Sequence, residues 1–169
     1  AVRLSRQEGL NTATLAITDY DTDGLADLVE FLTPTSTRFQ AKLTTLLQTQ
    51  PGTFAAVDTS LAGVNGIDGG VVADLNRDGR PDFASVGAYP VGSPSTVYSA
   101  LNTFMQDGSG RFSLTASIAL PISANRVAAG DLNGDGRNDL VALGPDDQVV
   151  QLLQSSTEPG TFLAPRLLD

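Results

Sequence analysis

The 169-residue sequence contains no cysteine, no histidine and no tryptophan, and it has only one methionine. Cysteine and histidine are the usual protein ligands of zinc, copper and iron, so their absence argues against a site for these metals. Their absence also excludes disulfide bonds and any chemistry that uses either side chain as a nucleophile or base. No apolar run approaches the roughly 18 residues of a transmembrane helix. No signal peptide opens the chain, as we expect of a mature or trimmed form.

Positive charge is also scarce. The sequence has 10 basic and 19 acidic residues, for a net charge of −9. Lys42 is the single lysine, and the nine arginines are scattered without forming a basic stripe. We therefore expect neither nucleic-acid binding nor attachment to an anionic membrane through a polybasic patch.

The negative charge, in contrast, is concentrated. Three segments share the pattern D-x-[DN]-x-D-G-x-x-D followed by an apolar residue, and they begin at Asp19, Asp74 and Asp131. These first aspartates lie 55 and 57 residues apart (74 − 19 and 131 − 74). A period near 56 residues indicates a repeat architecture.

The pattern is suited to Ca²⁺, which binds six to eight oxygen ligands and accepts irregular geometry. Oxygen-bearing side chains at positions 1, 3 and 5 can surround one ion, and glycine at position 6 permits the sharp reversal of the chain. Position 7 would contribute its backbone carbonyl and position 9 a further carboxylate. The predicted ligands of the three calcium sites are Asp19, Asp21, Asp23, Leu25 and Asp27; Asp74, Asn76, Asp78, Arg80 and Asp82; and Asp131, Asn133, Asp135, Arg137 and Asp139.

Three bound Ca²⁺ would change the net charge from −9 to −3 (−9 + 6), so metal ligation accounts for much of the acidity. We expect the side chains of Arg80 and Arg137 to point to solvent. We also expect replacement of Asp78 and Asp82 together by asparagine to remove one bound calcium and to lower the melting temperature only when calcium is present.

Other interpretations of the loops are weaker. Mg²⁺ keeps several of its waters, so a site made entirely of protein ligands favours Ca²⁺. Glu30 at position 12 completes an EF-hand pattern in the first segment only, and short β-like runs flank all three segments where an EF-hand needs helices. A single Asp/Asn-rich turn needs no metal. Several uncompensated carboxylates in each of three turns, however, would repel one another.

Short runs rich in β-branched and apolar residues predict four strands in each repeat. The runs are residues 13–17, 28–32, 43–48 and 55–57; 71–73, 83–86, 97–104 and 114–120; and 127–129, 140–143, 149–153 and 163–168. A glycine turn ending in phenylalanine separates the last two runs of each repeat, at Phe54, Phe112 and Phe162. Four short strands with turns between them are typical of a propeller blade. We therefore predict an all-β chain of three β-propeller blades within one repeat region.

The predicted repeats span residues 12–60, 61–120 and 121–169, and residues 1–11 resemble the outer strand of a preceding blade. The Gly/Pro-rich stretch 87–95 is expected to be the longest insertion. Because blades bury both faces against neighbours and complete propellers have four to eight, three blades indicate either part of a larger propeller or self-assembly through the exposed faces.

With these motifs in place, the chain resembles the FG-GAP/VCBS repeat family, which includes the integrin α-subunit propeller and several secreted bacterial and fungal proteins. The resemblance covers about residues 12–169 and implies calcium bound in the hairpin of each blade by the ligands given above. The Phe-Gly and Gly-Ala-Pro elements that name the family are poorly kept, with residues 87–90 the nearest approach. This favours the broader bacterial type of repeat over an integrin-like one.

Three classes of function are consistent with this sequence. The first is a calcium-stabilised scaffold for adhesion, protein interaction or assembly. The second is a carbohydrate-binding lectin, with Tyr89, Tyr98 and Phe104 as candidate sugar contacts, although each fits a strand core or edge as well. Tyr20 is expected to pack against its own hairpin. The third is an accessory domain of a secreted enzyme; we predict no catalytic residues in this chain. Calcium modules outside the cell bind at roughly 10⁻⁴–10⁻³ M, which places the protein in an extracellular location, secreted or at the cell surface.

Overall fold

The computed structural model describes residues 10–34, 41–60, 67–90, 97–108, 111–145 and 147–168. Within these ranges it has twelve strands and no helix that could cross a membrane. The strands are β1 (Leu10–Thr18), β2 (Asp27–Pro34), β3 (Lys42–Gln50), β4 (Thr53–Ser60), β5 (Gly69–Ala73), β6 (Asp82–Pro90), β7 (Val97–Gln106), β8 (Phe112–Ala119), β9 (Arg126–Gly130), β10 (Asp139–Leu143), β11 (Val149–Leu152) and β12 (Arg166–Leu168).

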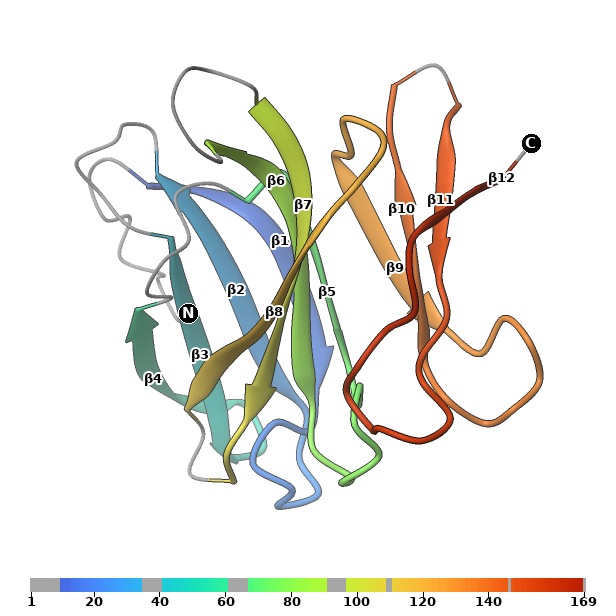
Figure 1. The fold of residues 1–169 in the computed structure, drawn as a ribbon. Helices are drawn as coiled ribbons and strands as arrows, with labels where there is room; N and C mark the ends of the chain where they lie inside the picture. Colours follow the sequence, from blue (N-terminus) through green and yellow to red (C-terminus); the bar gives the residue numbers. More distant parts are fainter. Residues whose placement is uncertain are drawn as a thin grey trace.

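The strands form three four-stranded antiparallel sheets, and within each sheet every strand pairs with the next one along the chain. We call these sheets blade 1 (β1–β4), blade 2 (β5–β8) and blade 3 (β9–β12). The first strands contact one another, β1 with β5 and β5 with β9, so the blades fan out from a shared inner edge. Figure 1 shows blade 2 between the other two, with the loops that join the first and second strands at one end of the molecule, lower in the picture. The prediction of an all-β chain with propeller-like blades is confirmed.

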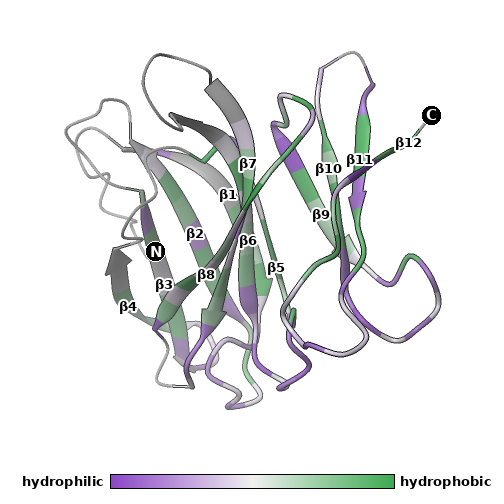
Figure 2. Ribbon diagram, viewed as in Figure 1, coloured by the Kyte–Doolittle hydropathy of each residue, from purple (hydrophilic) through white to green (hydrophobic). Residues whose placement is uncertain are grey.

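Hydrophobic residues gather along the strands, and hydrophilic residues at the loops of the lower end (Figure 2). The alternation of side chains along a strand explains the pattern in β6, where Phe83 packs toward blade 1 and the next residue, Ala84, toward blade 3. Each pair of neighbouring blades therefore encloses its own apolar core. A blade in the middle is buried on both faces.

The core between blades 1 and 2 is built around aromatic rings. Phe31 of blade 1 stacks on Phe83 of blade 2 with ring centroids 3.6 Å apart, and Phe83 stacks in turn on Phe104 at 5.6 Å. Leu75, Leu101, Leu140 and Leu152 belong to the core between blades 2 and 3, and all four are fully buried. Fully burying a side chain of this size contributes roughly 1.5–3 kcal/mol. The packing between blades therefore contributes a large part of the stability of the fold.

The structure differs in detail from the predicted elements. The fourth strand of blade 3 is only Arg166–Leu168, preceded by an isolated bridge between Gln154 and Phe162, where a strand over 163–168 was expected. The first part of the expected insertion at 87–95 is a continuation of β6 to Pro90, and residues 91–96 lie outside the described residues. Strand β1 begins at Leu10, so residues 10 and 11 belong to blade 1 and not to the outer strand predicted over residues 1–11; the rest of that predicted strand, residues 1–9, also lies outside the described residues.

Candidate metal centres in three aspartate loops

The three aspartate motifs form the connections between the first two strands of each blade. We call them loop 1 (residues 19–27), loop 2 (74–82) and loop 3 (131–139), and number their positions 1 to 9. The position-1 aspartate caps each loop from within. In loop 2, Asp74 Oδ1 accepts the N–H of Arg77 at 2.6 Å and of Asp78 at 3.2 Å, while Oδ2 accepts the N–H of Gly79 at 2.9 Å. Asp19 and Asp131 accept the corresponding bonds, from Asp23 and Gly24 and from residues 134–136 respectively.

The reversal of each loop uses left-handed backbone at two positions. Glycine at position 6 has φ values of +88°, +83° and +77° in loops 1, 2 and 3, which agrees with the reason for expecting glycine there. Position 4 is also left-handed, and it is Thr22 in loop 1, Arg77 in loop 2 and Gly134 in loop 3. Because Thr and Arg rarely adopt this conformation, the first two loops hold strain at position 4 that the surrounding hydrogen bonds must offset.

The position-9 aspartate is the most buried part of each loop. Asp27, Asp82 and Asp139 are all fully buried, and each uses both carboxylate oxygens in the same way. One oxygen accepts the N–H of position 2, at 2.7, 2.9 and 3.0 Å in loops 1, 2 and 3. The other accepts an N–H from the third strand or its end, at Gln48, Gln106 and Gln154, over 2.7, 2.9 and 2.8 Å. Position 9 therefore ties the loop to the third strand, in addition to its predicted role as a ligand.

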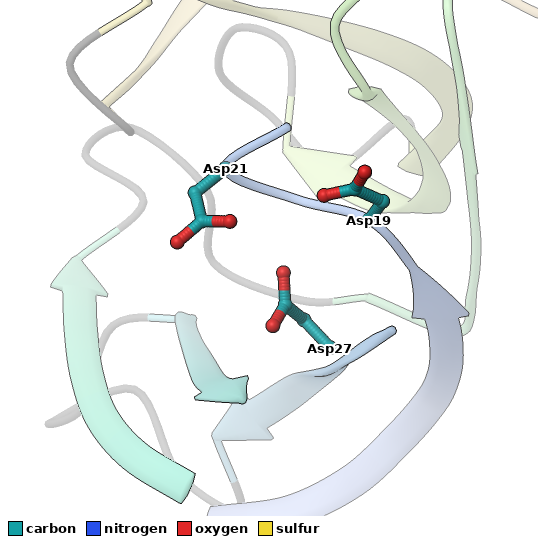
Figure 3. Close-up of side chains that lie close together, drawn as sticks. All are labelled: Asp19, Asp21 and Asp27. Carbon is teal, nitrogen blue, oxygen red and sulfur yellow. The ribbon is translucent and has the colours of Figure 1, made fainter. Parts of the chain in front are cut away.

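Loop 1 brings three of its four predicted side-chain ligands together. Carboxylate oxygens of Asp19, Asp21 and Asp27 all lie within 4.8 Å of one another, and Figure 3 shows these groups around a common space. Desolvation, followed by the charges of Asp23 and Asp27, raises the pKa of Asp21. Asp23 lies outside this group and accepts the N–H of Leu25 at 2.8 Å. A cation placed among the three carboxylates would offset the repulsion between them.

Loops 2 and 3 differ because asparagine replaces aspartate at position 3. The amide of Asn76 donates to Asp78 Oδ2 at 3.2 Å, and that of Asn133 donates to Asp135 Oδ2 at 2.9 Å. These bonds bring positions 3 and 5 next to each other. Among the described residues, only loop 1 brings three carboxylates within 4.8 Å of one another, so loops 2 and 3 do not reproduce that group. The set of carboxylates, amide oxygens and backbone carbonyls fits a hard cation such as Ca²⁺.

The position-7 arginines correct one prediction in part. Arg80 is exposed as expected, with its side chain 44% accessible, but it also forms an ion pair with Asp78 at 2.9 Å. Arg137 does not point to solvent and lies 3.4 Å from Asp135. The side chain of Arg137 is only 19% exposed. A short loop forces position 7 back over position 5, so the guanidinium meets the nearest carboxylate. These arginines partly neutralise loops 2 and 3, whereas position 7 of loop 1 is Leu25.

The protonation of these carboxylates follows their surroundings. Burial raises the pKa of Asp82 to about 6, against the hydrogen bonds that it accepts from Gln106 and Leu75. The hydrogen bond from the Gly136 N–H is the main cause that lowers the pKa of Asp131. At Asp78, desolvation by itself raises the pKa. The hydrogen bonds from the Arg80 backbone and the Asn76 amide outweigh it, so the pKa of Asp78 is lowered. The lowered pKa values of Asp78 and Asp131 favour the charged carboxylate, the form that binds a cation. Asp82 is the exception, because its raised pKa favours the protonated form.

Sequence reasoning missed the three glutamines that join the loops to their surroundings. The side-chain amide of each donates to the position-8 carbonyl of its own loop: Gln48 to Ala26, Gln106 to Pro81 and Gln154 to Asn138, at 3.2, 3.4 and 3.3 Å. Two of them also reach the neighbouring blade. Gln106 donates to the carbonyl of Tyr20 in loop 1, and Gln154 to that of Leu75 in loop 2. The sequence did hold one signal for these glutamines: each pairs across the strands with the phenylalanine that ends the glycine turn of its repeat.

Two aromatic expectations can also be compared with the structure. Phe104 is 1% exposed in the core, so it cannot serve as a sugar platform; the side chains of Tyr89 and Tyr98 lie outside the described part. Tyr20 is buried, but against blade 2 as well as its own blade, with its ring 5.8 Å from that of Phe112. Glu30 lies on β2, buried, and does not belong to the carboxylate group of loop 1. With strands on both sides of the loop, this supports the prediction against an EF-hand.

Comparison with known proteins identifies the repeat. A family model described as FG-GAP-like repeat matches residues 19–85 and 91–142, which is more than half of the chain. The chain belongs to the FG-GAP-like repeat family. A search of curated proteins returned no match. Both matched FG-GAP-like stretches contain an aspartate loop, and the first contains two, loops 1 and 2. Repeats of this family often bind Ca²⁺, and in this chain loop 1 presents the acidic group that such binding uses.

Proposed function

We propose that this chain is an extracellular, calcium-binding β-propeller scaffold that supports adhesion, protein interaction or assembly, and that each aspartate loop binds one Ca²⁺. The observation that carries the proposal is the repetition of one geometry in three loops. In each loop a buried position-9 carboxylate accepts two backbone N–H groups, and a position-1 carboxylate caps the turn. In loop 1 three carboxylates also lie within 4.8 Å of one another, and a bound cation would offset their repulsion.

The structural effect of the ion would be to stabilise the loops. Binding to the folded state alone adds RT ln(1 + [L]/Kd), which is about 1.4 kcal/mol per site at millimolar calcium and a Kd near 10⁻⁴ M. Three sites would then add about 4 kcal/mol, a large part of the stability of a typical domain. Sites of this affinity are filled outside cells and empty in the cytosol, which supports an extracellular location.

Thermal unfolding in three buffers tests this function. We expect millimolar calcium to raise the melting temperature by about 8–16 °C over a chelator, since 1 kcal/mol corresponds to roughly 2–4 °C for a domain of this size. Magnesium at the same concentration should have a much smaller effect, because it keeps its own waters. Equal melting temperatures with calcium and with chelator would contradict the proposal.

A second candidate function is binding of a glycan, and a cleft between blades 1 and 2 favours it. The cleft has a volume of about 290 Å³ and lies beside loop 1, where polar and apolar groups converge; its lining includes Asp21, Thr22, Leu47, Arg80 and Gln106. Its volume lies at the lower end of the range of small-molecule sites, and its mixed polar and apolar lining suits a hydroxyl-rich ligand such as a sugar. A glycan array probed with calcium and again with chelator tests it. Binding to a defined sugar would make the protein a lectin, and no binding in either buffer would leave the scaffold alone.

A further inference from the structure

Two clefts lie at equivalent places in the fold, one between blades 1 and 2 and one between blades 2 and 3. We call them cleft A, with a volume of about 290 Å³, and cleft B, with about 400 Å³. Each is lined by position 3 of an aspartate loop, by the residue before the glutamine of the same blade, and by a glycine from the glycine turn of the next blade. These shared positions are Asp21, Leu47 and Gly108 in cleft A, and Asn76, Met105 and Gly160 in cleft B.

The two clefts differ in the charges on their walls. Cleft A has one acidic and one basic side chain, Asp21 from blade 1 and Arg80 from blade 2. The described lining of cleft B has no charged side chain and consists of Asn76, Met105, Thr115, Ala116, Ile118 and residues 159–162. The packing of two blades therefore leaves a cleft without requiring charged groups in it, and the charged pair of cleft A is a feature of that cleft alone among these two.

The guanidinium of Arg80 is held in place with one edge unused. Its Nη1 donates to Asp78 Oδ2 at 2.9 Å, whereas within the described residues its Nε and Nη2 have no hydrogen-bond partner. Gly108 leaves room for it, because a Cβ at this position would lie 3.1 Å from Cζ and 3.2 Å from Nε of Arg80. The side chain is 44% exposed, so a ligand can reach it. Nε and Nη2 form one edge of the planar guanidinium, and such an edge binds both oxygens of a carboxylate.

The wall from blade 1 supplies hydrogen-bond acceptors and an apolar surface. The Thr22 hydroxyl donates to the Asp21 carbonyl at 2.7 Å, so its oxygen can still accept a hydrogen bond, as can the carboxylate of Asp21. Leu47 and Val57 add apolar surface, and Val57 is 43% exposed. A sugar has hydroxyl donors around its rim and C–H groups on the faces of its ring, so both kinds of group on this wall suit a sugar.

We propose that cleft A binds a sugar that carries a carboxylate, a uronic acid. The carboxylate lies against Nε and Nη2 of Arg80, and the hydroxyls donate to Asp21 and Thr22. A volume at the lower end of the range of small-molecule sites suits a single sugar ring. The proposal rests on the second candidate function, a sugar in this cleft, and adds the class of sugar. Calcium in loop 1 would offset the charge of Asp21 beside the anionic ligand, so the sugar binds best when calcium is present.

A nuclear magnetic resonance titration of the chain in millimolar calcium tests the proposal with two probes. Methyl β-glucuronide and methyl β-glucoside differ only in whether one ring carbon carries a carboxylate or a hydroxymethyl group. The glucuronide should bind about tenfold more tightly, because the charge-assisted hydrogen bonds from Arg80 need the carboxylate. The backbone amide signals of Thr22 and Gly108, which line the cleft from different blades, should both shift as the glucuronide saturates the chain.

Two arginine variants separate a bound carboxylate from a general effect of charge. Arg80→Met removes the guanidinium but keeps the position-7 carbonyl, and it should bring the two affinities within about twofold of each other. Arg166→Met is the matched control, because it makes the same change at an exposed arginine on β12 of blade 3. It should keep the preference of about tenfold for the glucuronide.

The outcomes distinguish this proposal from the functions proposed above. Equal affinity of wild type for the two probes would overturn the uronic acid and leave the lectin candidate in place. If neither probe binds while calcium still raises the melting temperature, the uronic acid and the lectin candidate are both overturned but the calcium scaffold is not. A preference that survives Arg80→Met, or that disappears with Arg166→Met, would overturn the role of Arg80.

Discussion

Replacing the position-9 aspartate of loop 3, Asp139, by asparagine tests whether this residue stabilises the fold by hydrogen bonds in addition to its proposed role as a calcium ligand. Asp139 is fully buried and accepts the N–H of Leu132 at 3.0 Å and of Gln154 at 2.8 Å, one on each oxygen. In asparagine, the amide oxygen can still accept one of these N–H groups. The amide NH₂ replaces the other oxygen, so the second backbone N–H faces a donor and loses its acceptor. An unsatisfied buried donor costs about 1–3 kcal/mol, so we expect Asp139→Asn to lose about 2 kcal/mol of unfolding free energy even in chelator. This corresponds to about 4–8 °C in melting temperature.

The matched control is Asp135→Asn at position 5 of the same loop. Asp135 is exposed, and its Oδ1 accepts the Arg137 N–H at 2.9 Å, a bond that an asparagine oxygen can keep. Its Oδ2 accepts the Asn133 amide at 2.9 Å and lies 3.4 Å from Arg137 Nε, and asparagine would lose these two contacts. Because contacts of exposed charges contribute about 0–1 kcal/mol, we expect this variant to melt no more than about 4 °C below wild type in chelator, less than Asp139→Asn. Both variants should lose one bound calcium. Thermal unfolding with calcium and with chelator measures the melting temperature of each variant. Equal melting temperatures for the two variants in chelator would refute the structural role of position 9.

The same reasoning changes the expectation from sequence for loop 2. Because Asp82 is held like Asp139, its replacement should lower stability without calcium too, and not only with it.

Three further predictions follow from other residues. The pKa of Asp82 is raised from 3.8 to about 6 in the folded chain, so the folded state binds this proton more tightly than the unfolded state does. Without calcium, the resulting stabilisation is fully present below pH 3.8 and is lost as the pH rises through 6. Calcium binds the charged carboxylate, so the calcium-induced gain in melting temperature should grow between about pH 5 and 7. Gly136→Ala should lower the free energy of unfolding by about 1 kcal/mol, because Gly136 has φ +77°, a conformation that alanine disfavours. Gly130→Ala is the control: an added Cβ meets no atom there and φ is not left-handed, so chemical denaturation should show no such loss. Gln106→Ala should cost about 1 kcal/mol more than Gln48→Ala, because the Gln106 amide bonds to Tyr20 of the neighbouring blade, whereas the Gln48 amide, among the described residues, bonds within its own blade; equal losses would contradict the interblade bond.

The loops and strands could be predicted from sequence because their signals are local. Glycine at position 6 and the alternating carboxylates lie within nine residues, and the apolar runs on either side have the length of a strand. The glutamine contacts could not be predicted in the same way. Gln48, Gln106 and Gln154 follow their position-9 aspartates by 21, 24 and 15 residues (48 − 27, 106 − 82 and 154 − 139), because the hairpin between them changes length. A fixed spacing search does not find such a set.

Side-chain direction was the other limit. The arginines at position 7 were expected in solvent. Arg80 is exposed, but only the folded loop shows that the carboxylate at position 5 lies within reach of both arginines and that Arg137 is largely covered. The sequence likewise indicated that Tyr20 packs near its own hairpin, while its ring also contacts the next blade at Phe112. Both differences arise because the loop reversal and the fan of blades bring together groups that the linear pattern does not relate.

The measurement that tests the central claim most directly is a calorimetric calcium titration of the chain after exhaustive dialysis against chelator. The three repeated loops predict three calcium ions bound per chain, and two for Asp135→Asn. Failure of wild type to bind calcium, or an unchanged number of ions for the variant, would contradict the assignment of the aspartate loops as calcium sites.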